Sequence, residues 1–154
     1  MAMMGNRKWI WIVLLIAFIA ALVGYRMFSR ANPDVVQAEP NFVISAVDLI
    51  AAFENDSSNA ARKFANKIIQ VSGTVMSIDT AGAVVLGTAN TPSVVVVGLE
   101  QRHMADLQHI KAGAELALQG LYSGYEQSGS NPNDLLAGLG TTIQLRSGGL
   151  KKKD

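Results

Sequence analysis

The longest uninterrupted run of apolar residues lies near the start of the chain. Trp9 to Tyr25 are 17 residues without a charged or amide side chain, and cations stand on both sides. A membrane-spanning helix needs roughly 17 to 25 such residues. Trp9, Trp11 and Tyr25 stand where aromatic rings favour the lipid headgroup layer, and Arg26 can extend its charge toward water. The pattern predicts an uncleaved transmembrane signal anchor over 9–25, after a tail of residues 1–8.

Two other interpretations of this run compete with a membrane anchor. A buried helix this apolar would need a larger core than a chain of 154 residues can supply. A cleaved signal peptide remains the alternative, because Ser29–Ala31 and Val36–Ala38 both carry small residues suited to cleavage. The run is nevertheless longer than the usual signal core of about 7–15 residues. The flanking cations tie in number, and the free amino group favours a cytoplasmic N-terminus. We therefore expect a single-pass protein of the inner membrane with its C-terminal domain in the periplasm.

The segment after the run has no apolar period. Residues 29–41 contain Pro33, Pro40, two Asn and mixed charges. Such composition is typical of a connecting segment. We predict a linker over 26–44.

A folded domain is predicted from residue 45 onward. Ser45 and Asp48 form a capping-box-like helix start, and the polar stretch 54–59 is expected to bend or interrupt that helix. Alternation then predicts a long first strand, in which a shift of phase beside Gly73 indicates a bulge or bend. Gly113 follows a short helix in a C-cap position. The predicted strands are 69–78, 83–86, 93–99, 116–122 and 141–146, with the short helix at 104–110.

The order of these elements predicts the fold class. A helix, three strands, a second helix and two strands form the layout of a five-stranded OB-fold barrel. We expect a mainly β domain over 45–147, with an N-terminal helix and a short helix between strands 3 and 4. A single transmembrane helix precedes the domain, and a basic tail, 148–154, follows it.

The sequence also resembles that of a known family over particular stretches. The stretch 48–55, with Ala60-Ala61, Phe64, Lys67 and the spaced Val71, Gly73 and Val75, is similar to the opening of the tRNA-anti-like family. The stretch 107–122 resembles its closing half. That family comprises bacterial OB-fold proteins, often of lipoprotein type. The resemblance covers about 45–147 and implies an OB fold, with nucleic-acid binding as an open question. This chain has no cysteine to carry a lipid, so the predicted helix would take its place.

Charge and aromatic content argue against nucleic acid as the partner. The whole chain carries 13 Lys and Arg against 12 Asp and Glu, and residues 41–154 carry nine against ten. Single-stranded nucleic acid is bound by a basic groove with aromatic platforms. The predicted second and third strands contain neither a cation nor an aromatic residue. A counterion-release contribution to affinity would therefore be small.

The candidate chemical groups have structural explanations. His103 and His109 lie six residues apart, which does not place two ligands on one helix face, and both are expected to be exposed. Asp79 fits a turn, and Ser123 has no evident base. We therefore predict no enzymatic activity, no metal and no cofactor.

The remaining prediction is a non-catalytic binding module. It would engage a protein or an envelope component, through a surface on the second and third strands or through the loop that follows the fourth strand. An exposed strand edge could also accept a partner strand. The alternative is a barrel that binds single-stranded nucleic acid. The oligomeric state stays open. The candidate binding residues are Val94, Val96, Tyr122, Tyr125, Asn131 and Asn133.

Overall fold

A computed structural model describes residues 6–28, 33–127 and 140–151 of the chain. The chain divides into two compact units, Met1–Pro33 and Asp34–Asp154.

The first unit contains helix α1, Asn6–Phe28. Its described side chains, residues 11–26, are all exposed, including Trp11, Tyr25 and Arg26. Within the described part of the chain, no helix combines the length and the apolar character needed to cross a membrane. The structure therefore supports a helix at the predicted position but not the predicted transmembrane helix over 9–25.

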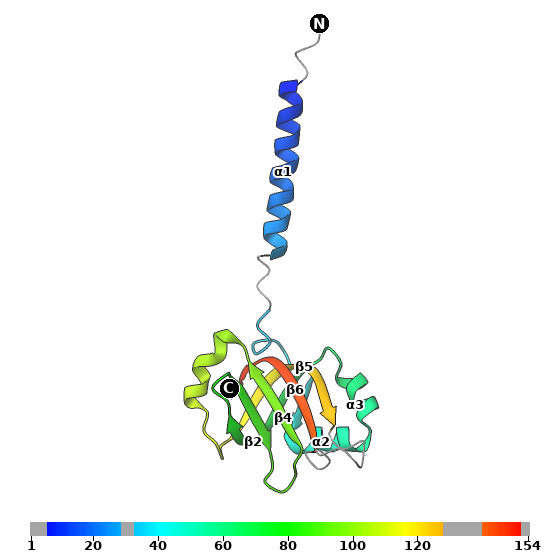
Figure 1. Cartoon of the computed structure of the whole chain (residues 1–154), viewed down its shortest axis with the longest axis vertical. Helices are drawn as coiled ribbons and strands as arrows, with labels where there is room; N and C mark the ends of the chain where they lie inside the picture. Colours follow the sequence, from blue (N-terminus) through cyan, green and yellow to red (C-terminus); the bar gives the residue numbers. More distant parts are fainter. Residues whose placement is uncertain (1–5, 29–32, 128–139, 152–154) are drawn as a thin grey trace, which may run out of the picture. The chain divides into compact units, whose positions relative to one another are not determined.

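The second unit is built around a closed five-stranded barrel (Figure 1). The strands follow one another in the order β2-β3-β4-β6-β5, and β2 closes the barrel by pairing with β5. All neighbours are antiparallel except β4 and β6, which are parallel. This confirms the predicted mainly β barrel with its helices. The strands are β2 Ile68–Ile78, β3 Ala83–Gly87, β4 Val94–Leu99, β5 Glu115–Gln127 and β6 Thr141–Leu150.

Strand β2 is long because it serves both sides of the barrel. Residues 68–74 pair with β5, and residues 74–78 pair with β3. The register shifts between Val75 and Ser77, so the bulge lies at Met76, three residues after the Gly73 expected from the sequence. A Cβ at Gly73 would lie 2.9 Å from the Cβ of Ala46, so glycine there allows the preceding helix, which begins at Ala46, to approach the strand closely.

Two short helices cover the barrel core, and the first begins at the predicted cap. Helix α2, Ala46–Asn55, begins at Ser45, whose Oγ accepts a 3.0 Å hydrogen bond from the Asp48 N–H. Asp56 separates it from α3, Ser57–Phe64, and accepts a 2.9 Å hydrogen bond from the Asn59 N–H. The polar stretch 54–59 therefore does interrupt the helix, because Asp56 ends one helix and caps the next.

An aromatic cluster joins the helices to the barrel. Phe53 of α2 is fully buried, and its ring lies 6.0 Å from that of Phe64 and 5.8 Å from that of Tyr122. Such ring pairs stabilise the core by more than the burial of their apolar surface alone. Tyr125 and Phe42 complete the cluster through Phe53 and Phe64 respectively.

Several boundaries differ from those expected. Strand β1, Phe42–Ser45, lies largely within the predicted linker, 26–44, and pairs in parallel with β2, and the compact unit begins at Asp34. Strands β5 and β6 continue to Gln127 and Leu150, beyond the expected ends at residues 122 and 146. The short helix between β4 and β5 is η1, a 3-10 helix over Gln101–His109. The strand boundaries depend on pairing with strands that are distant in the sequence, and a local apolar pattern does not indicate that pairing.

Candidate functional site

Strand β4 lies between β3 and β6. Its half-buried side chains and their neighbours on the outward face are uncharged, whereas the exposed Arg146 follows farther along β6. Val96 pairs with Val85 on one side and with Gln144 on the other, and Val94 pairs with Thr142. All five side chains are half-buried. This face corresponds to the strands through which OB folds bind their ligands. The structure therefore places the predicted residues Val94 and Val96 together on one face.

Tyr122 and Tyr125 do not belong to that face. Tyr122 is buried, with 9% of its surface exposed, and packs against Phe53. Burial, and secondarily the neighbouring Tyr125, raise the pKa of the Tyr122 phenol. The ring of Tyr125 lies 5.1 Å from that of Phe53 and is half-buried. Packing on α2 therefore places the candidate binding residue Tyr122 in the core and leaves Tyr125 partly exposed beside it.

Asn131 and Asn133 lie outside the described residues, as does the side chain of Trp9. Of the predicted loop site, the structure therefore describes only Tyr122 and Tyr125, which lie on β5.

A second arrangement, which the sequence did not indicate, is the N-terminal strap, residues 34–38. The amide Nε2 of Gln119, fully buried on β5, donates 2.6 Å hydrogen bonds to the carbonyl oxygens of Val35 and Ala38. Val36 is buried, and its carbonyl accepts a 3.2 Å hydrogen bond from the Lys151 Nζ. The strap is thus part of the domain.

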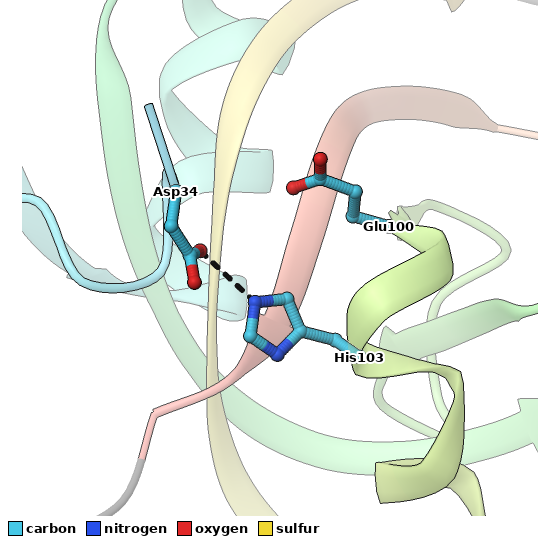
Figure 2. Close-up of side chains that lie close together, drawn as sticks. All are labelled: Asp34, Glu100 and His103. Carbon is cyan, nitrogen blue, oxygen red and sulfur yellow. Dashed lines mark hydrogen bonds and ion pairs between the residues drawn. The ribbon is translucent and has the colours of Figure 1, made fainter. Parts of the chain in front are cut away.

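The strap brings Asp34 to the start of η1, where Glu100 and His103 lie (Figure 2). The His103 Nε2 is 2.9 Å from the Asp34 Oδ1, and one potential ligand atom from each of the three residues lies within 4.8 Å of the others. Burial opposes ionisation of Asp34, but hydrogen bonds from His103 and the Val36 N–H outweigh it and lower the pKa of that carboxyl. The cluster therefore favours an ionised aspartate beside an imidazole.

The Glu100 carboxylate uses its two oxygens differently. Its Oε1 forms a 2.5 Å ion pair with the Arg102 Nη2. Its Oε2 is buried and has no hydrogen-bond partner within the described structure. Buried polar atoms are nearly always paired, so an unpaired carboxylate oxygen is unusual. In Figure 2 this carboxylate and the His103 ring extend from η1 toward Asp34.

A glycine on β6 makes room for the His103 ring. A Cβ at Gly149 would lie 2.8 Å from the His103 Cγ and 2.7 Å from the Val36 Cγ2. The His103 side chain is 17% exposed, whereas His109 belongs to the exposed residues. The expectation that both histidines are exposed is therefore wrong for His103. The sequence carried no signal for the cluster, because 69 residues separate His103 from Asp34, which stood in the predicted linker.

Comparison with known proteins agrees with this architecture. The model of the tRNA_anti-like family matches residues 1–131 of the chain. The chain is also similar to a crystal structure of a "putative nucleic acid-binding lipoprotein" from Klebsiella pneumoniae, with a TM-score of 0.51 and 14% sequence identity. The similarity covers 71% of this chain and 91% of the Klebsiella chain. At that identity the likeness concerns the fold. No protein among those of curated function matches the chain.

Proposed function

Since the chain belongs to the tRNA_anti-like family, we propose that it is a non-catalytic binding module whose barrel engages a protein or envelope component through the face of β3, β4 and β6. The observation that carries the proposal is the row Val85, Val96 and Gln144, with Val94 and Thr142 beside it. It presents small, uncharged, half-buried side chains on the strands that OB folds use for binding.

The chemistry of this face favours a protein over a nucleic acid. Strands β3 and β4 carry no cation and no aromatic side chain. Stacking on aromatic rings and neutralisation of phosphates provide most of the affinity for single strands. Depletion of charge is, in contrast, typical of the centre of a protein interface.

The face can be tested by site-specific crosslinking in the intact cell. We expect a photoreactive residue in place of Val96 to form a discrete adduct with one partner, and the same residue in place of Gln108, exposed on η1, to form none. Adding Val94→Arg should abolish the adduct at position 96, because it places a charge at the centre of the face. Equal adducts at positions 96 and 108 would show that the face has no special role.

The second candidate, binding of single-stranded nucleic acid, is favoured by the name of the similar Klebsiella protein. Counterion release makes such binding strongest at low salt, so the test is titration of a labelled single-stranded oligonucleotide at about 50 mM salt. The protein-binding proposal expects no saturable binding. Saturable binding that weakens steeply with added salt would replace it with the nucleic-acid function.

We further propose that α1 attaches the module to a membrane, with the barrel on the extracytoplasmic side. The support is the uncharged run Trp9 to Tyr25 and the exposure of its described apolar side chains. Contiguous exposed apolar surface of this kind marks contact with a membrane or a partner. The full chain should stay with membranes after alkaline carbonate extraction, and protease added to the periplasmic side should reach the barrel. Leu15→Asp with Ile19→Asp should release it, and a wild-type chain in the soluble fraction would refute the attachment.

A further inference from the structure

We propose that Asp34, Glu100 and His103 form a binding site for one divalent transition-metal ion of the Zn²⁺ type. This site lies apart from the face of β3, β4 and β6 and goes beyond the binding function proposed for it. It would join the N-terminal strap to the start of η1.

The donor set is the first support. One imidazole nitrogen and two carboxylate oxygens are ligands that Zn²⁺ accepts, with bonds of about 2.0–2.2 Å, and three protein ligands leave a fourth position for water. The His103 Nε2 and the Asp34 Oδ1 already lie 2.9 Å apart. The ligand atoms of all three residues lie within 4.8 Å of one another, so a small movement of the side chains toward a shared ion would complete the set.

The unpaired oxygen of Glu100 is the second, independent support. Arg102 takes Oε1 and leaves Oε2 buried without a partner among the described residues. A buried carboxylate oxygen without a hydrogen bond is costly in free energy. A cation shared with Asp34 and His103 would supply the missing partner and would leave the Arg102 ion pair in place.

The outer residues hold the ligands in position. The His103 Nδ1 lies 3.6 Å from the Asp106 Oδ2, and metal-bound histidines commonly direct their second nitrogen to a carboxylate. The Val36 N–H donates a 3.0 Å hydrogen bond to the Asp34 Oδ1. Gly149 leaves space for the His103 ring, as described above. Each ligand is thus held by a neighbour that does not itself need to touch the ion.

The placement indicates a structural role for the ion. Asp34 belongs to the strap, whereas Glu100 and His103 belong to the β4–β5 connection. An ion bound to all three would hold residue 34 against the barrel. Because it binds only the folded arrangement, it would raise the thermal stability of the chain in a concentration-dependent way.

The test is titration of the metal-free full chain, solubilised in detergent and carrying no affinity tag, with Zn²⁺ by calorimetry. We expect one ion per chain and a rise in the unfolding temperature. Asp106→Asn should weaken binding by about 10- to 100-fold, the usual effect of losing a carboxylate behind a metal-bound histidine. Glu100→Gln, which keeps the size of the side chain, and His103→Ala should each abolish the saturable binding.

The matched control is His109→Ala, an exposed histidine on the same 3-10 helix, which should bind Zn²⁺ as the wild type does. Co²⁺ provides a second measurement on the unaltered chain, because ligation by His103 should give visible absorption bands that Zn²⁺ displaces. The absence of saturable Zn²⁺ binding would overturn the proposal. So would binding that is unchanged in Glu100→Gln and His103→Ala.

Discussion

The hydroxyl of Ser93 donates a 2.6 Å hydrogen bond to the Glu54 Oε1 and so joins the start of β4 to the last turn of α2, 39 residues earlier in the chain. The same Ser93 Oγ accepts a 3.0 Å hydrogen bond from the buried N–H of Thr141, the first residue of β6. One hydroxyl group thus connects a helix and two strands at one end of the barrel.

Ser93→Ala should therefore destabilise the domain more than a surface change does. The substitution leaves the buried Thr141 N–H without its acceptor, which costs about 1–3 kcal/mol. The free energy of unfolding in urea measures the effect. Ser123→Ala, at an exposed position on β5, is the control and should change it little. Equal stabilities of the two variants would contradict the role of Ser93.

Gln119→Leu should loosen the N-terminal strap. It removes both hydrogen bonds from the buried Nε2 and leaves the carbonyl oxygens of Val35 and Ala38 without that donor. We expect a loss of up to about 1–3 kcal/mol for each of these part-buried carbonyl groups that is left without a donor, together with faster proteolysis within residues 34–41. Gln108→Leu, on the exposed side of η1, serves as the control. Unchanged proteolysis of Gln119→Leu would show that the strap is held by other contacts.

Gly148→Ala should be poorly tolerated on β6. A Cβ there would lie 2.6 Å from the Val97 Cγ1 and 3.1 Å from the Gln119 carbonyl oxygen, so the barrel wall would have to shift. Overpacking of this kind typically costs about 1–3 kcal/mol. Gly124→Ala meets nothing within 4 Å and is the matched control. Thermal unfolding of the two variants separates steric overlap from a general effect of losing glycine.

Tyr122 should make the stability of the domain depend on alkaline pH. Its pKa in the folded state is raised above 10.0, first by burial and then by the charge of Tyr125, whereas the unfolded chain ionises near the ordinary value. The stability that the neutral Tyr122 phenol gives to the folded domain is therefore fully present below the pKa of Tyr122 in the unfolded chain. It is lost as the pH rises through the pKa of Tyr122 in the folded domain. Unfolding free energies measured across that range should fall less steeply for Tyr122→Phe. The same slope in both proteins would place the effect elsewhere.

Features that depend on neighbouring residues in the chain were predictable from the sequence. Ser45 and Asp48 identified the start of α2, because a helix cap is formed within one turn. Asp56 lies in the stretch where the break between the helices was expected, since a short polar side chain competes for nearby backbone groups. The alternation along β2 identified its buried face, because side chains of a strand point alternately inward and outward.

Only the tertiary structure decided which surfaces remain free and which groups meet. The sequence indicates Tyr122 as a candidate binding residue, but in the folded domain Phe53 of α2 packs against its ring and buries it. The sequence predicts a linker at Asp34. In the structure the side-chain amide of Gln119 binds the strap to the barrel, and the Asp34 carboxylate lies within hydrogen-bond distance of His103. The physical reason is the same in each case. Such contacts arise between segments far apart in the chain, and their stability depends on packing and burial that no local pattern records.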